Sequence, residues 1–172
     1  MSIAHSDDCY DMLGLDRQVC FPLYAATNLL GRVYRPLLEP LGLTYSQYLV
    51  MLILWEDAPV HVGAIAHRLF IDTATITPML KRMQDQGLLT RSRDHFDQRH
   101  VTVQLTPLGQ SLKDRAKAIP QDLSDQIGDH LGQDVIEDLR KTVRNLVTVL
   151  AGTLDKPVGA EMRSADIAQT TK

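Results

Sequence analysis

The order of elements between residues 62 and 105 constrains the fold of this chain most. A short helix is indicated by apolar residues at the spacing i, i+3, i+4, i+7, namely Val62, Ile65, Ala66 and Leu69. A second short helical pattern follows Asp72 and stops at Gly87. Two strand patterns then run from Leu88 to Arg93 and from His100 to Leu105, joined by a polar loop. Two short helices followed by a hairpin predict a winged helix-turn-helix.

Longer helices are expected on both sides of this segment. They run from Asp16 to about Leu38, at about 45–56, from Pro107 onward, and from beyond Gly132 to Leu154. Thr44 and Gln47 form a capping box ahead of the second of these helices, and Thr106 caps the third. Pro120 is expected to kink or end that third helix. The predicted fold class is mainly α with a small β-hairpin wing, with long N- and C-terminal dimerisation helices.

The chain of 172 residues is long enough to bury a core without disulfides or a structural metal. We expect a flexible segment at 1–15, one domain at 16–154 whose DNA-reading part covers about 61–105, and a flexible tail at 155–172. No apolar run approaches the roughly 18 residues of a membrane span, and the acidic N-terminus lacks an apolar signal region. We therefore expect a cytoplasmic protein with no membrane partner.

The net charge of -3 hides an uneven distribution. Residues 61–115 hold eight Lys and Arg against five Asp, a balance of +3, whereas the remainder holds ten basic against sixteen acidic residues, a balance of -6. A basic segment in an acidic protein favours contact with phosphate through one surface only. Chance variation along a solvated surface explains the same counts, so the order of elements decides in favour of double-stranded DNA as the partner.

In a winged helix-turn-helix the second short helix enters the major groove with its N-terminal half. The residues expected to face DNA there are Thr75, Thr77, Lys81 and Arg82. Pro78 leaves two starts for this helix open. If Thr75 is the cap, the proline is tolerated at the third helical position, whereas a cap at Asp72 predicts a kink.

The hairpin is expected to reach the adjacent minor groove. Arg99, near the tip, is the predicted minor-groove residue, and Asp97 is placed to hold its guanidinium extended. Arg91 and Arg93 on the first strand complete the predicted DNA-binding residues. The alternative is an ordinary solvated hairpin with an incidental ion pair.

The chain resembles the MarR family of winged-helix regulators over about 16–152. The stretches that carry the resemblance are LGLTYSQYLVMLILWE, TATITPMLKRMQDQGLLTR, the Asp-Gln-Arg of the wing and LTPLG. More narrowly, the opening LDRQVCFPLYAATNLLGRVYRPLLEPLGLTY resembles the organic hydroperoxide resistance regulators, the OhrR branch. In that branch the reactive cysteine lies in the motif L-C-F-x-L-Y.

The resemblance implies a homodimeric repressor that leaves its operator when an organic hydroperoxide oxidises the reactive cysteine to a sulfenic acid. Cys20 matches that cysteine. The tyrosines that hydrogen-bond its thiolate in the family match Tyr24, Tyr34 and Tyr45. No cysteine follows Cys20, so the chain resembles the one-cysteine type, in which a small cellular thiol captures the sulfenic acid as a mixed disulfide. Cys9 is better explained as an exposed thiol than as a resolving one.

The position of Cys20 suits this chemistry. Cys20 falls within about the first turn of the first long helix, where the helix dipole favours the thiolate that reacts with peroxide. Tyr34 follows 14 residues later, about 20 Å along the axis at roughly 1.5 Å per residue. A bond from Tyr34 to the Cys20 sulfur therefore requires a partner chain whose first helix runs antiparallel. Oxidation is then expected to disturb the shared network and move the two recognition helices out of register with their half-sites.

Other functions stay open. A MarR-type regulator that responds to a phenolic or other small apolar ligand needs no reactive thiol, and Cys20 is then inert. A thiol peroxidase would use Cys20 for turnover, but no resolving cysteine completes its cycle, so we expect no enzyme. A metal sensor is disfavoured because the six histidines show no liganding cluster. We expect neither a cofactor nor a metal site.

Overall fold

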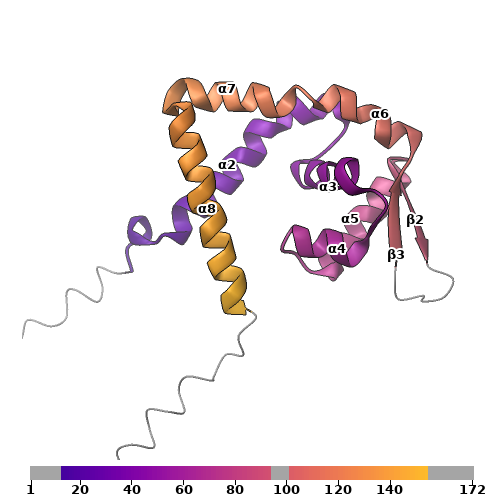
Figure 1. Ribbon diagram of the computed structural model, residues 1–172, viewed down its shortest axis with the longest axis horizontal. Coiled ribbons are helices and arrows are strands. Elements are labelled where there is room, and N and C mark those ends of the chain that lie inside the picture. The colour runs from indigo at the N-terminus through magenta and orange to yellow at the C-terminus, as the bar shows by residue number, and fades with distance from the viewer. Residues whose placement is uncertain (1–12, 94–100, 155–172) are drawn as a thin grey trace, which may run out of the picture. The chain divides into compact units, whose positions relative to one another are not determined.

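The computed structural model describes residues 13–93 and 101–154. The first elements are the 3-10 turn η1 (Leu15–Arg17), α2 (Cys20–Leu38), the 3-10 turn η2 (Glu39–Leu41) and α3 (Tyr45–Asp57). The middle elements are β1 (Val60–His61), α4 (Val62–Arg68), α5 (Thr73–Asp85), β2 (Leu89–Arg93) and β3 (Val101–Leu105). The last helices are α6 (Pro107–Ala116), α7 (Ile119–Leu131) and α8 (Gln133–Leu154), drawn from red-brown to yellow in Figure 1.

The chain divides into two compact units whose boundary lies between Gln121 and Asp122, inside α7. The first unit contains the described elements from η1 through α6, and the second contains the remainder of α7 and α8. Gly132 separates α7 from α8 with a φ of 84°, a left-handed conformation that glycine adopts without a steric penalty. The predicted fold class is confirmed, whereas the expected boundaries at residues 15 and 155 stay predictions.

A single core holds the winged helix-turn-helix together. Its fully buried side chains come from each main element of the motif: Tyr48, Met51 and Leu54 on α3, Ile65 on α4, Ile76, Leu80 and Met83 on α5, Leu89 on β2 and Val103 on β3. Each such apolar side chain contributes roughly 1.5–3 kcal/mol on burial. Figure 1 shows α4 and α5 beside the hairpin, so this core fixes which faces of α5 and of the strands stay in solvent.

The wing is a three-stranded antiparallel sheet with the order β1-β3-β2. The pairing of β2 with β3 runs from Leu89 opposite Leu105 to Arg93 opposite Val101, which confirms the predicted hairpin. β1 was not predicted, because two residues are too few to show a period of two. The loop residues 94–100, which include Asp97 and Arg99, lie outside the described residues.

The predicted helix caps are confirmed. The Thr44 amide donates to Gln47 Oε1 at 2.9 Å, and the Gln47 amide donates to Thr44 Oγ1 at 3.4 Å, which is the expected capping box. Thr106 Oγ1 accepts from the amide of Gly109 at 3.1 Å, with proline as the first helical residue after it. These caps determine where α3 and α6 begin.

Two expectations about proline are now decided. Asp72 directly precedes the first residue of α5, so Pro78 lies inside the helix and the start at Thr75 is excluded. The third long helix is interrupted just before Pro120, in line with the expected kink or end at this residue. That helix, α6, ends at Ala116, and Pro120 is the second residue of α7, a position at which the missing amide costs no intrahelical bond.

Among the described residues, no single helix is long and apolar enough to cross a membrane. The bent pair formed by Cys20–Leu41 and Tyr45–Asp57 passes the same length and composition criteria, and α3 of this pair carries many of the buried core residues.

Candidate functional site

The exposed face of α5 carries the residues predicted to meet DNA. Ile76, Leu80 and Met83 anchor the helix in the core, which leaves Thr75, Thr77, Lys81 and Arg82 in solvent. Thr77 Oγ1 donates to the carbonyl oxygen of Thr73 at 2.6 Å, and its oxygen still has lone pairs for a donor on DNA. The polar face of α5 therefore offers two hydroxyls and two cations together.

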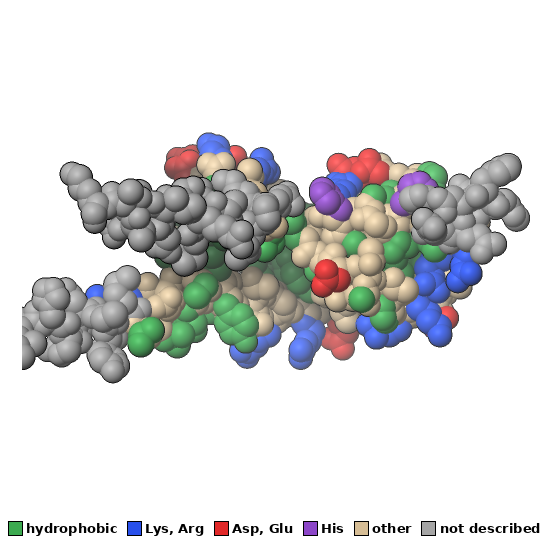
Figure 2. Space-filling model, turned by 90° about the horizontal axis from the view of Figure 1, so that it is seen from below, with side chains coloured by type: hydrophobic (Ala, Val, Ile, Leu, Met, Phe, Trp, Pro, Cys, Tyr) green, Lys and Arg blue, Asp and Glu red, His purple; other side chains and the backbone are tan. Residues whose placement is uncertain are grey.

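The first strand of the wing adds two arginines beside this helix. Arg93 ends β2 and is exposed, whereas Arg91 is half-buried. Arg91 Nε donates to Gln84 Oε1 at 2.9 Å, which ties the strand to the last turn of α5. In Figure 2, Lys and Arg side chains gather around the end of the view in which the strands lie. Helix and wing thus present positive charge to one partner surface.

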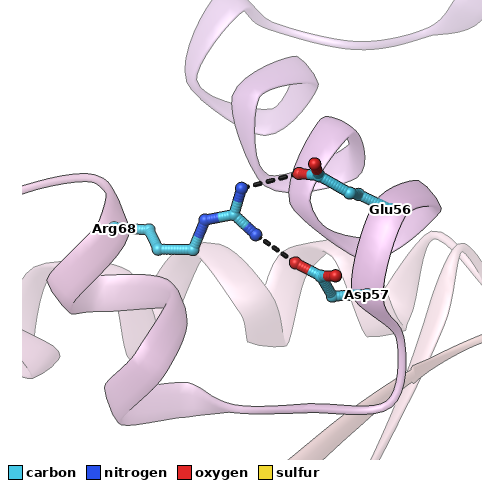
Figure 3. A network of polar contacts seen from close by, with 3 residues as sticks. All are labelled: Glu56, Asp57 and Arg68. Atoms are coloured by element: carbon cyan, nitrogen blue, oxygen red, sulfur yellow. Dashed lines mark hydrogen bonds and ion pairs between the residues drawn. The ribbon is translucent and has the colours of Figure 1, made fainter.

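Three basic residues that the charge count included are engaged within the protein. Arg68 on α4 reaches two carboxylates at the end of α3: it lies 2.6 Å from Glu56 Oε2 and also pairs with Asp57 (Figure 3). Lys113 Nζ donates to the carbonyl oxygen of Trp55 at 2.8 Å, and Arg115 donates to that of Pro40 at 2.6 Å. Among the described residues of 61–115, the other Lys and Arg side chains lie on α5 and β2.

Cys20 is the first residue of α2, so it lies within the first turn as predicted, although the helix begins at Cys20 and not at Asp16. Its side chain is exposed. Tyr24, one turn further along the helix, is 69% exposed. Of the 19 residues of α2, only Leu38 is buried. The exposed residues of the helix include several large apolar ones, namely Tyr24, Leu29 and Val33. A helix with so much apolar surface in solvent indicates a partner surface.

Tyr34 and Tyr45 meet at the opposite end of α2 from Cys20. Their ring centroids lie 4.7 Å apart, and the ring of Tyr34 lies 5.8 Å from that of Tyr48, a residue that sequence reasoning missed. Tyr48 in turn meets the edge of Trp55 at 6.3 Å. These three tyrosines, Tyr34, Tyr45 and Tyr48, are called the tyrosine cluster below. Within one chain the cluster and Cys20 are separated by most of the length of α2, about 20 Å.

Burial raises the pKa values of the tyrosine cluster above the ordinary 10.0. It raises the pKa of Tyr34 to about 12, and the neighbouring hydroxyls of Tyr45 and Tyr48 add to this shift. The pKa values of Tyr45 and Tyr48 are also raised, mainly by burial. A neutral phenol donates a hydrogen bond, so the cluster presents donors at neutral pH.

The structure joins some of the predicted residues and separates others. Tyr34 and Tyr45 are in contact, and the predicted residues of α5 and β2 lie on adjoining elements. Cys20 and Tyr24 share the exposed start of α2. Three glutamines that link elements were not predicted to do so, namely Gln47, Gln84 and Gln86, because nothing in their sequence neighbourhood indicates contacts across 7 to 39 residues.

Comparison with known proteins matches residues 43–101 to the MarR family. The chain is 44% identical over 127 residues to the organic hydroperoxide resistance transcriptional regulator of Bacillus subtilis (strain 168), covering 72% of this chain and 86% of that protein. It is 38% identical over 154 residues to the HTH-type transcriptional regulator TtmR of Methylorubrum extorquens (strain PA1), covering 89% and 79% respectively.

Among solved structures, the overoxidized AbfR bound to DNA, a protein of Staphylococcus epidermidis, matches with a TM-score of 0.63 and 35% identity. The match covers 80% of this chain and 98% of AbfR. Together with the exposed basic face of α5 and β2, these relatives define a winged helix-turn-helix transcriptional regulator that binds DNA. Within that class, the chain belongs to the MarR family.

Proposed function

We propose that this protein is a homodimeric repressor that senses organic hydroperoxides through Cys20 and then releases its operator. The observation that carries the proposal is the placement of Cys20, an exposed thiol at the first position of α2. The likeness to a regulator named for organic hydroperoxide resistance supports it. The likeness to AbfR, which has been solved in reduced, overoxidized and disulfide-formed states, supports a cysteine that changes its oxidation state.

The chemistry begins with the Cys20 thiolate. Its sulfur attacks one oxygen of the peroxide bond, so that an S–O bond forms, the O–O bond breaks, and the leaving alkoxide takes a proton to become an alcohol. The sulfur is oxidised by two electrons to a sulfenic acid. A small cellular thiol then attacks this sulfur, forming a mixed disulfide and releasing water.

The tyrosines are proposed to hold the reduced thiolate across the dimer. Tyr24 is one helical turn from Cys20 and contributes from the same chain. Tyr34 and Tyr45 come from the partner, because Tyr34 of the same α2 lies about 20 Å away along the axis. The exposed apolar residues of α2 suit such an antiparallel contact, since they gain from burial.

Release follows from the volume of the oxidised side chain. A packed interface has no room for a mixed disulfide, so the two first helices must shift. The recognition helices α5 of the two protomers then lose the spacing of half-sites about 34 Å apart, one DNA turn. Contacts from Thr75, Thr77, Lys81 and Arg82, and from Arg91 and Arg93 with Asp97 and Arg99 on the wing, are lost together.

The Cys20→Ser variant tests this function. We expect it to bind an operator fragment with wild-type affinity and to stay bound at cumene hydroperoxide concentrations that release the wild type, because a hydroxyl is not oxidised by peroxide. Fluorescence anisotropy with DNA from beside its own gene measures both. Cys9→Ser is the matched control and should release like the wild type. Release of the Cys20→Ser variant at wild-type peroxide doses would sink the proposal.

A second candidate is a regulator that responds to a small phenolic ligand. A mainly apolar cleft of about 340 Å³ lies between α3 and the helices after the wing, lined by Tyr48, Leu52, Trp55 and Lys113 among others. Lys113 Nζ donates one hydrogen bond to the Trp55 carbonyl and keeps two N–H donors for a carboxylate of such a ligand. Release of the Cys20→Ser variant from DNA by a phenolic carboxylate, without any oxidant, would favour this candidate.

A further inference from the structure

We propose that Gln47 and Gln86 are positioning residues that couple the tyrosine cluster to the recognition helix, so that their hydrogen bond sets how strongly oxidation weakens DNA binding. This inference rests on the proposed function, because it names the link between the sensor and the DNA-binding elements. It concerns contacts inside the first compact unit, from α2 to β2.

The first turn of α3 belongs to the sensor. Its first residue, Tyr45, packs against Tyr34 with 4.7 Å between ring centroids and the planes tilted by 35°, and the ring of Tyr48 lies 5.8 Å from that of Tyr34. Gln47 lies between these two tyrosines in sequence. Any movement of Tyr34 therefore acts directly on the turn that carries Gln47, because packed aromatic rings cannot pass through one another.

Gln47 connects this turn to the end of the recognition helix. Its side chain is 6% exposed and uses both ends: Oε1 accepts from the Thr44 amide at 2.9 Å, and Nε2 donates to Gln86 Oε1 at 3.1 Å. Because the capping box holds Oε1, the amide cannot rotate freely and Nε2 has a fixed direction. Gln86 follows the last residue of α5 and its amide bonds back to the carbonyl of Arg82.

The same end of α5 also holds the wing. Gln84 Oε1 accepts from Arg91 Nε at 2.9 Å. One helical turn is thus tied to α3 through Gln86 and to β2 through Gln84. A shift at the start of α3 therefore moves the recognition helix and the wing together. Such a joint movement would remove the contacts of both elements with DNA at the same time.

The bond between Gln47 and Gln86 is open to a clean substitution. Gln86 is exposed, so a change there opens no cavity in the core. Gln86→Met keeps the length of the side chain and removes the acceptor, whereas Gln86→Glu keeps an acceptor for Gln47 Nε2. The neighbouring Asp85→Asn is the matched control, since Asp85 is exposed on the same helical turn.

The experiment measures the operator Kd of each full-length variant in the reduced state and after oxidation with cumene hydroperoxide and a small thiol. Mass spectrometry confirms that Cys20 is equally modified in all of them. We expect the ratio of oxidised to reduced Kd to be at least fivefold lower in Gln86→Met than in the wild type. In Gln86→Glu and Asp85→Asn the ratio should stay within twofold of the wild-type value. A helix-end residue with only a structural role would lower thermal stability without changing this ratio.

The outcomes separate the two proposals. A Gln86→Met variant that is oxidised at Cys20 and keeps the wild-type ratio overturns the coupling and leaves the proposed function standing. If the ratio of oxidised to reduced Kd falls in Asp85→Asn as well, the assignment of the coupling to Gln86 is overturned. A wild-type protein whose Kd does not respond to oxidation overturns the proposed function and the coupling with it.

Discussion

Individual side chains in this protein take their chemistry from their neighbours. Arg68 and Arg82 are both exposed arginines within the basic middle segment, yet two carboxylates of α3 engage the first, and the second stands on the polar face of α5. Tyr24 and Tyr34 both lie on α2, but Tyr24 is 69% exposed whereas Tyr34 packs against the rings of Tyr45 and Tyr48. The type of a residue therefore indicates a role, and its contacts in the folded protein determine whether it can have that role.

The salt dependence of operator binding should distinguish these arginines. We expect Arg82→Met and Arg99→Ala each to weaken binding and to reduce the slope of log K against log salt by about 1, because each loses one phosphate or groove contact. Arg68→Met is the matched control and should keep the slope, since its guanidinium is held by Glu56 and Asp57. Titrations of anisotropy between low and moderate salt measure the slopes. An unchanged slope and affinity in Arg99→Ala would remove Arg99 from the interface.

The raised pKa of Tyr34 predicts a loss of stability at alkaline pH. The folded state holds the Tyr34 proton with a pKa of about 12, above the ordinary 10.0 of the unfolded chain. The stabilisation that protonated Tyr34 gives the folded state is therefore complete below pH 10 and is lost as the pH rises toward 12. Urea midpoints across this range should fall less steeply in Tyr34→Phe than in the wild type. Equal slopes in the two proteins would show that Tyr34 does not titrate in this way.

Among the elements, α6 holds the wing against the helical core through its first turn. The carbonyl oxygen of Gly109 accepts from Trp55 Nε1 at 3.0 Å, and Thr106 Oγ1 donates to the carbonyl of Gly87 at 2.6 Å. Gly109 is required there for close approach, because a Cβ would lie 2.0 Å from the carbonyl oxygen of Leu88. The start of α6 is thus locked to α3 and to the residues just before β2.

A comparison of two helical glycines tests this lock. Gly109→Ala should lower the free energy of unfolding by about 3 kcal/mol, because backbone must move to admit the methyl group. Gly63→Ala on α4 meets no atom within 4 Å and should be neutral or stabilising by up to about 1 kcal/mol. Urea denaturation measures both. A Gly109→Ala protein as stable as the wild type would contradict the close packing of α6 on Leu88.

The whole molecule is proposed to work as a dimer because one chain does not bring its sensor parts together. Cys20 and the tyrosine cluster lie at opposite ends of α2, and α2 leaves the large apolar residues Tyr24, Leu29 and Val33 exposed. If α2 of a second copy packs antiparallel against α2 of the first, the contact covers the exposed apolar residues and brings Cys20 of one chain to the tyrosine cluster of the other.

Mixed dimers test whether the sensor is shared. A dimer of one Cys20→Ser protomer and one Tyr34→Phe protomer keeps one complete site, since the remaining cysteine faces the remaining Tyr34 across the interface. A dimer of a wild-type protomer and a double-variant protomer keeps none. We expect the first dimer to release DNA at lower peroxide doses than the second, measured by anisotropy after purification through two different tags. The reverse order would place the site within one chain.

Local signals in the sequence were enough to predict the helix-turn-helix, the hairpin, both caps and the position of Cys20 at the start of α2. Those features depend on periodicity, glycine, proline and capping residues within a few positions, which are local forces. The start of α5 at Thr73 was left open and the short β1 was missed, because both depend on neighbours in space. The expected start of the first long helix at Asp16 was wrong, since α2 begins at Cys20. Only the tertiary structure showed that Tyr34 contacts Tyr45, that Arg68 pairs with carboxylates of α3, and that Gln47 bonds to Gln86. The physical reason is that packing brings together residues far apart in the sequence, and no local pattern indicates such pairs.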